Sequence, residues 1–423
     1  MNRGWRRLIA SAAVALAACS EREPAPAAPS AAGSPASVAG ALGRAALTDT
    51  SAHGDAARGE RLMIEHQCNR CHEGGAQPAA AFETHCVSCH RSILAGSFPT
   101  AKDTLARWRP QVAPMRAVPS LLSIGARLRG DWIAGFLASP YDLRPLLAPS
   151  MPRLRLEPAD ARDLAAYLTR GSSARALASE RAAANPMRGR RLVEQRGCGS
   201  CHLFSGAAAL PSRPDAAVAA REDAVLLAPD LRHVRDRWAL PSLVAWLRDP
   251  RSLKADTLMP PTGFDAGEAR DVAAYLTTAP LAPLPAEPPE ARLPVLARNV
   301  SFAEVDEQVF RRTCRHCHGD PNDARGDGGP GNTGGFGFAP RGIDFSSYRA
   351  IASGYRDAKG ERHSLFEPAA DGTPRLVLAL LARREEESGR PRADVRGMPL
   401  GLPALSAEQI QLVDSWIAQG RPR

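Results

Sequence analysis

Apolar residues recur with helical spacing in several stretches of the chain. Ala161, Leu164, Ala165 and Leu168 fall at i, i+3, i+4 and i+7, the pattern of a helix with one buried face. The stretches that precede two of the cysteine pairs also suit short helices. No stretch alternates apolar and polar residues as a half-buried strand would. The pattern therefore predicts an all-α chain.

The last helix has the clearest boundary. Ile410, Val413 and Ile417 share one face. Ser406 with Gln409 forms a capping box, in which each side chain pairs with a backbone N–H at the helix start. We therefore expect the chain to end in a buried helix.

One unit of the chain occurs twice. Its front motif spans 59–72 and again 189–202, with a glycine nine residues before the first cysteine in both copies. Its back motif spans 151–169 and again 259–277, with Met-Pro followed by the predicted helix. Because both motifs repeat together, we expect each copy to be one fold.

The repeat, the linkers and the later cysteines divide the chain. We expect three tandem small helical domains, the first with an extra cysteine-bearing insertion. The boundaries are 1–18 for a signal peptide, 19–52 for an Ala/Pro/Ser-rich tether, 53–175 for domain 1, 185–279 for domain 2, 280–300 for a Pro-rich linker and 301–423 for domain 3.

The N-terminus reads as an export signal. Basic Arg3, Arg6 and Arg7 precede an apolar run, 8–18, that is too short to span a bilayer. The run ends in Leu-Ala-Ala-Cys, which resembles a bacterial lipobox and implies acylation at Cys19. An ordinary signal peptide with a chance cysteine is the alternative. We expect a lipoprotein anchored on the periplasmic side of a bacterial membrane.

The net charge of +9 argues little for nucleic acid. Three of the charges lie in the predicted signal peptide, and the cofactors inferred below would carry negative propionates. No basic stripe interleaved with aromatic residues is present. We therefore expect no nucleic-acid partner.

Eight of the nine cysteines form four Cys-x-x-Cys pairs, and each pair is followed at once by histidine. Two thiols at this spacing can form thioethers with the vinyl groups of one haem, and the next imidazole can bind its iron. The predicted attachment cysteines are Cys68, Cys71, Cys86, Cys89, Cys198, Cys201, Cys314 and Cys317. The predicted proximal ligands are His72, His90, His202 and His318. The sequence thus predicts four haems c.

Two other readings of the cysteine pairs stay open. An isolated pair could form a redox disulfide. The pairs at 68–71 and 86–89 are also separated by fourteen residues, which is close to zinc-ribbon spacing. However, the chain has only ten histidines, so a histidine after every pair favours haem.

With these motifs, the chain resembles multihaem, class I-like cytochromes c over residues 53–423. In that family a Met-Pro late in each domain supplies the second axial ligand of the iron. The resemblance implies this role for Met151, Met259 and Met398. A thioether ligand favours ferrous iron relative to a second histidine.

The second pair of domain 1 departs from the single-haem pattern. The interval from His72 to Pro119 is 47 residues, against 27 from His202 to Pro229, and the extra residues contain the pair at 86–89. Met115, His66 and His53 are candidate distal ligands for this haem, and an open iron position is the alternative. His85 could contact the neighbouring haem or be solvated.

We expect an electron-transfer protein rather than an enzyme, with redox proteins as partners. A peroxidase-like haem oxidoreductase, with a vacant position at the 86–90 haem, is one alternative. An electron-delivery subunit of a membrane redox complex is another. We interpret the acidic run 385–387 as a solvated face.

Overall fold

The computed structural model describes residues 54–141, 143–147, 151–154, 156–172, 184–211, 222–285, 291–319, 341–357, 359–392 and 394–423. Cys19 and His53 lie outside these residues. The described chain is helix-rich and its only strands are two residues long, which confirms the all-α prediction. None of its helices is long and apolar enough to cross a bilayer.

The elements follow one another in three groups. The first has α2 (Ala56–Glu65), η1 (Cys68–Arg70), η2 (Phe82–Thr84), α3 (Cys86–Ala95), α4 (Lys102–Val112), η3 (Ala113–Met115), η4 (Ile124–Ala126), α5 (Gly130–Ala138) and α6 (Pro158–Thr169). The second has α7 (Pro186–Gln195), η6 (Cys198–Ser200), α9 (Glu222–Leu226), η7 (Leu231–His233), α10 (Val234–Arg237), α11 (Leu240–Arg248), α12 (Pro250–Leu253) and α13 (Ala266–Thr278). The third has α14 (Phe302–Val305), the π-helix η8 (Asp306–Cys314), α15 (Arg315–His318), α16 (Tyr348–Ala352), the antiparallel pair β1 (Tyr355–Arg356) and β2 (Arg362–His363), α17 (Arg375–Glu387) and α18 (Ala407–Ala418).

In both repeats the front helix packs on the back helix, α2 on α6 and α7 on α13. The two helices approach so closely that a Cβ added at Gly59 would lie 2.0 Å from the carbonyl oxygen of Asp163. A Cβ at Gly189 would lie 2.0 Å from the carbonyl oxygen of Asp271. Only glycine fits this crossing, which explains why both front motifs carry one at the same place.

A buried aspartate ties each front helix to its back helix. Asp163 accepts hydrogen bonds from the backbone N–H of Asp55, at 2.7 Å, and from the Arg58 side chain. Asp271 does the same for the N–H of Asn185, at 2.6 Å, and for Arg188. The two aspartates sit on the buried face of their helices, so their burial depends on these partners.

The third domain has its own core around Trp416, which is fully buried. Its last helix, α18, begins with the expected capping box of Ser406 and Gln409. The chain joins this core earlier than the expected boundary at residue 301. Arg292 pairs with Asp414 at 2.8 Å, and Val300 is fully buried. Residues 291–300 are therefore tied to domain 3 through Arg292 and Val300, although most of the residues between them stay exposed.

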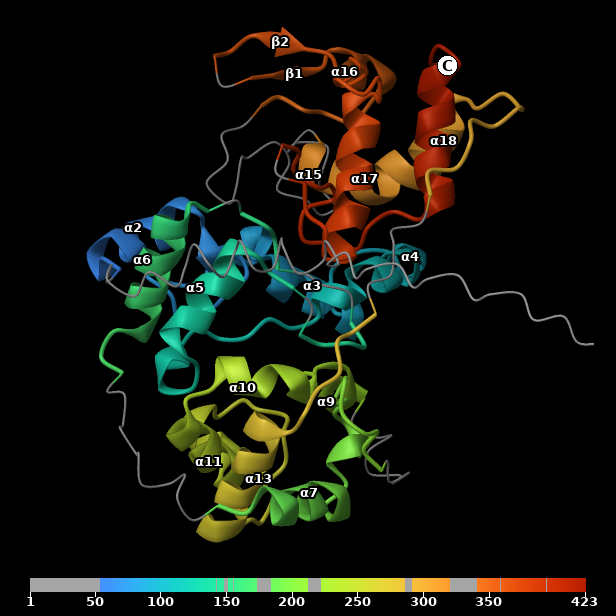
Figure 1. The fold of residues 1–423 in the computed structure, drawn as a ribbon. Coiled ribbons are helices and arrows are strands. Elements are labelled where there is room, and N and C mark those ends of the chain that lie inside the picture. The colour runs from blue at the N-terminus through green and yellow to red at the C-terminus, as the bar shows by residue number, and fades with distance from the viewer. Residues whose placement is uncertain are drawn as a thin grey trace, which may run out of the picture.

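Domain 1 lies between the other two in Figure 1, with α5 facing α10 on one side and α15 above α3 on the other. Toward domain 2, Leu128 pairs with Trp238 as an isolated antiparallel bridge, and the N–H of Arg129 donates to the carbonyl of Arg237 at 2.8 Å. Toward domain 3, Leu402 packs against a small cluster around Cys71. Domain 1 therefore touches both neighbours.

The expectation that 385–387 is a solvated face is wrong for Glu386. This side chain is buried, pairs with buried Arg383 at 3.2 Å and accepts the N–H of Gly397 at 3.0 Å. Arg383 also donates to the carbonyl of Leu402 at 3.0 Å. The pair pins the loop after α17, which carries Met398, and this tertiary contact outweighs the polarity of the local sequence.

Candidate functional site

The attachment turns of the two repeats have the same backbone geometry. The N–H of His72 donates to the carbonyl of Cys68 at 2.9 Å, and the N–H of His202 donates to that of Cys198, also at 2.9 Å. In both, the residue just before the first cysteine is left-handed, Gln67 with φ 50° and Gly197 with φ 70°. The turn thus folds each histidine back under its own cysteine pair.

Each histidine of these turns is fixed by one distant carbonyl. Nδ1 of His72 lies 2.8 Å from the oxygen of Pro119, and Nδ1 of His202 lies 2.8 Å from that of Pro229. A carbonyl oxygen only accepts, so Nδ1 carries the proton and Nε2 keeps its lone pair. Burial also lowers the pKa of both imidazoles. A neutral ring with a free Nε2 is the form that binds iron, so the residues fit a haem ligand.

The eight described cysteines form no disulfide with one another. Burial raises the pKa of Cys68 and Cys198 to about 11, and that of Cys314 and Cys317 to about 12. In the described part of the chain, only Asp357, Glu361 and His363 gather three potential ligands within 4.8 Å. The cysteines at 68–89 do not converge as a zinc site requires.

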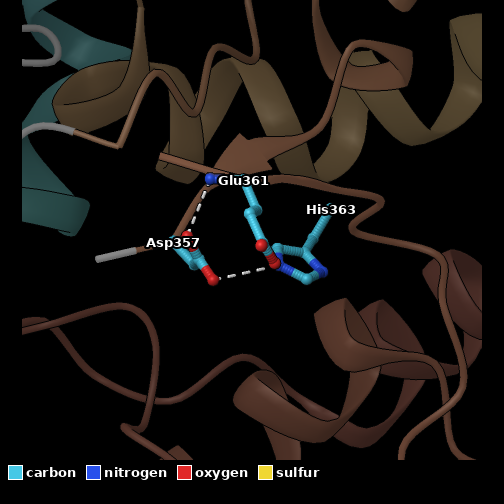
Figure 2. A group of neighbouring side chains, drawn as sticks. All are labelled: Asp357, Glu361 and His363. Carbon is cyan, nitrogen blue, oxygen red and sulfur yellow. Dashed lines mark hydrogen bonds and ion pairs between the residues drawn. The ribbon is translucent and has the colours of Figure 1, made fainter. Parts of the chain in front are cut away.

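The Asp357, Glu361 and His363 group closes the β1–β2 hairpin (Figure 2). Asp357 accepts the backbone N–H of Glu361 at 2.8 Å and lies 3.3 Å from Nε2 of His363. The imidazole also stacks on Tyr355, with ring centroids 5.5 Å apart. These contacts explain the group as the tie that holds the hairpin together.

The second cysteine pair of domain 1 lies in a regular helix, not in a 3₁₀ turn. Helix α3 begins at Cys86, and His85 caps it by accepting the N–H of Ser88 on Nδ1 at 3.1 Å. His85 is 4% exposed, which excludes the solvated alternative for this residue. His90 is also buried.

Met115 is the distal-ligand candidate that lies against this second pair. It is buried in one small cluster with Cys71 and Val87, and Cys86 packs on the same cluster. His66 forms the C-cap of α2, and His53 is outside the described residues. The packing therefore favours Met115 among the three candidates.

The thiols of Cys71 and Cys86 share a hydrogen bond across the two attachment sites of domain 1. Donation from Cys71 is the largest effect that lowers the pKa of Cys86 to about 7, and the Arg70 guanidinium lowers it further. The same hydrogen bond raises the pKa of Cys71. The insertion thus brings the two cysteine pairs into direct contact.

The three predicted methionine ligands are all half-buried. The sulfur of Met259 accepts a hydrogen bond from Nε1 of Trp246 at 3.0 Å. Met259 also lines a cavity of about 540 Å³ in domain 2, with Asp223 and Arg251 on its walls, which is within the size range of cofactor pockets. The backbone N–H of Met398 donates to the carbonyl of Ala379 at 2.9 Å.

The third domain reaches its cysteine pair through a π-helix. Buried Asp306 pairs with Arg311 at 2.9 Å and with Arg315 at 3.1 Å, which ties the start of this helix to α15. The carbonyl of His318 accepts the N–H of Phe345 at 2.6 Å. Residues 320–340, with the glycine-rich run of this domain, lie outside the described part of the chain.

Sequence reasoning missed the residues that support these sites. Asp163 and Asp271 occur at the same place in the repeated Ala-Arg-Asp of the back motifs, and this identity was the available signal. Trp246 and Arg70 carry no such signal, because nothing near them in the sequence indicates what they contact.

Comparison with known proteins identifies one segment. Residues 76–172 match the family model described as Cytochrome c. This match supports the inference that the segment binds haem c covalently and takes part in haem-based electron transfer. It contains the pair at 86–90 together with Met115 and Met151, and it begins after His72. No curated protein and no solved structure matches the chain.

Proposed function

We propose that this chain is an exported electron-transfer protein that carries four covalently attached haems c. Three of the proposed sites follow the order attachment turn, then Met-Pro, and the fourth is the insertion at 86–90. The match of residues 76–172 to the cytochrome c family supports the chemistry. The number four rests on the four Cys-x-x-Cys-His motifs.

The observation that carries the proposal is the bond from histidine Nδ1 to a proline carbonyl. It has the same length, 2.8 Å, in two repeats whose intervening loops differ by twenty residues. Such a bond fixes the ring orientation and makes Nε2 a better donor to a metal. A histidine with only a structural role has no need of the same free nitrogen in both places.

Each group of residues has a defined task in this proposal. The haem, when attached, supplies an iron that takes up and releases one electron. The cysteines would hold it covalently as thioethers, each formed by addition of a thiol to a vinyl group, and His72, His90, His202 and His318 would each offer Nε2 to an iron. Met151, Met259 and Met398 would each offer a thioether sulfur as the second protein ligand in their sites, and Met115 would do so in the site at 86–90. Because thioether sulfur favours the ferrous state, we expect high potentials.

We further propose that the protein acts on the periplasmic side of a bacterial membrane, held by a lipid on Cys19. The basic start, the short apolar run and the Leu-Ala-Ala-Cys ending support export and acylation. The tether 20–52 would let the domains reach redox partner proteins beyond the lipid surface. These partners include free carriers or the subunits of a membrane redox complex.

A peroxidase-like oxidoreductase remains the second candidate and requires an open iron position at 86–90. The burial of Met115 beside Cys86 argues against an open position there. Met115→Ala should convert one haem of the purified protein to the high-spin state, seen in its absorption and electron paramagnetic resonance spectra. A high-spin haem that is already present in the unmutated protein, and is unchanged in Met115→Ala, would favour the enzyme.

Counting haems in the exported, mature protein tests the proposal. Intact mass and the pyridine haemochrome assay should both give four haems, and Cys86→Ala with Cys89→Ala should give three. Cys19→Ala is the matched control, because it should keep all four haems while releasing the protein from membranes. Bare thiols, disulfides or zinc at the eight cysteines would overturn the proposal.

A further inference from the structure

Arg70 is a buried charge inside an attachment turn. It lies between Cys68 and Cys71 and is only 7% exposed. Its Nε is 3.4 Å from the carbonyl oxygen of Thr84, two residues before Cys86, and its Nη1 is 3.3 Å from Oε1 of Gln67. Arginine is rarely buried to this extent, because removing its charge from water is costly. The side chain thus reaches from the first attachment site of domain 1 to the second.

The two attachment sites of domain 1 meet beside this guanidinium, and the third domain packs next to them. Cys71 is buried with Val87 and Met115, and both Cys86 and Leu402 of the third domain pack on that cluster. The Arg70 guanidinium works to lower the pKa of the thiols of Cys71, Cys86 and Cys317, which is consistent with its charge lying near all three. One cation therefore lies at the junction of the sites at 68–72, 86–90 and 314–318.

The site of the second repeat has no arginine between its two cysteines, and the arginine that acts on Cys198, Arg196, is exposed. Its attachment turn has the same backbone geometry, but Ser200 occupies the position of Arg70. The chain thus contains its own reference site, which differs from the first at this position.

We propose, on the basis of the function above, that Arg70 is a tuning residue whose buried charge raises the reduction potentials of the haems at 68–72, 86–90 and 314–318. Reduction removes one positive charge from the iron, so a nearby cation favours the reduced state. In a buried setting this Coulomb interaction is only weakly screened. The haem at 198–202 is outside its influence.

The test compares the potentials of Arg70→Gln and Arg70→Lys in the exported four-haem protein. Potentiometric titration gives the four potentials, which are assigned by removing one cysteine pair at a time. In Arg70→Gln we expect three reduction potentials to fall. The largest fall should be about 59 mV for one electron, which is a tenfold decrease in the equilibrium constant for reduction. The potential assigned to 198–202 should not change.

Arg70→Lys separates the charge from the packing. Lysine keeps the charge but not the planar guanidinium, so its potentials should stay close to those of the unmutated protein. Equal losses in both variants would mean a structural role and overturn the proposal. Arg61→Gln removes an exposed arginine of the same domain and should shift none of the potentials.

The haem count keeps this test apart from the proposed function. Fewer than four haems in the unmutated protein would refute the function itself, whereas four haems with potentials unaffected by Arg70→Gln would refute only the tuning role. If Arg70→Gln fails to load four haems, the Ser200→Arg variant tests the tuning role instead. It should raise the potential at 198–202, and no rise there would overturn the proposal.

Discussion

The two repeats of this chain share a frame and differ in what they enclose. In both, the front and back helices cross at a glycine, are tied by a buried aspartate and hold a histidine against a proline carbonyl. That proline comes 47 positions after the histidine in the first repeat and 27 positions after it in the second. The histidine–proline hydrogen bond has the same length in both repeats although the number of residues between its partners differs. The helix pair and this hydrogen bond therefore define the fold.

The insertion is tolerated because it packs on itself. Helices α3 and α4 form a small cluster of their own with Ile93, Leu105 and Val112, apart from the main core of the repeat. It meets the first attachment site where Cys71 packs with Val87 and Cys86, and where Nε of Arg70 lies 3.4 Å from the carbonyl oxygen of Thr84. A second cysteine pair could thus be added without rebuilding the first.

The helix crossing should be equally sensitive in both repeats, and here we expect the largest effect. Gly59→Ala and Gly189→Ala each place a Cβ against a backbone carbonyl that cannot move, at a cost of about 3 kcal/mol or more. Thermal unfolding followed by circular dichroism checks this. Gly130→Ala, whose Cβ would meet only ordinary contacts at 3.6 Å, is the control. If Gly59→Ala left the unfolding temperature unchanged while Gly189→Ala lowered it, the two helix crossings would not be equivalent.

The aspartate ties should give the next largest effect. Asp163→Ala and Asp271→Ala each leave a backbone N–H without its acceptor, and a hydrogen bond to a charged group contributes about 1.5–3 kcal/mol. We expect similar losses of unfolding free energy in both variants by denaturant titration. Asp131→Ala, an exposed aspartate of α5, should change little. Unequal losses would show that the ties are not equivalent.

The contact between the repeats should respond to pH through His233, whose ring packs on that of Tyr141 at an interplanar angle of 47°, with centroids 4.9 Å apart. Burial lowers the pKa of His233 to about 4, whereas an unfolded histidine has a pKa of about 6.5. Between these two pKa values the unfolded chain binds one proton more than the folded chain. The contribution of His233 to the unfolding free energy is therefore fully present above about pH 6.5 and is lost as the pH falls toward 4.

His233→Gln should flatten this part of the pH dependence, as measured by thermal unfolding from about pH 4 to about pH 7. The equivalent residue of the first repeat is Ser123, so the effect belongs to one side of the contact. The same acid sensitivity in His233→Gln would assign it to other groups.

The smallest effect should come from Trp246→Phe. In the first repeat Phe136 holds this position, four residues before Pro140, as Trp246 precedes Pro250. In the proposed haem site at 198–202, removing the indole N–H from the sulfur of Met259 leaves the thioether a slightly stronger donor to ferric iron. We expect the reduction potential of the haem at 198–202 to fall, with a change in the free energy of reduction of less than about 1 kcal/mol. Potentiometric titration measures this change. A rise, or a shift at 68–72, would contradict this.

The sequence by itself determined the features that neighbouring residues decide. The helical spacing at 161–168, the capping box of Ser406 and Gln409, and the two turns at 68–72 and 198–202 each involve groups within one or two turns of backbone. Their geometry follows from local hydrogen bonds and sterics, so the pattern of residues suffices to predict them.

Only the tertiary structure decided which polar residues are buried and what they face. Asp163, Glu386, Arg70 and His85 look like surface residues in the sequence, yet each is nearly excluded from solvent. Met115 likewise gained its place beside Cys86 from packing. Desolvation depends on segments far away in the chain, and a buried charge persists only where such a segment supplies its partner.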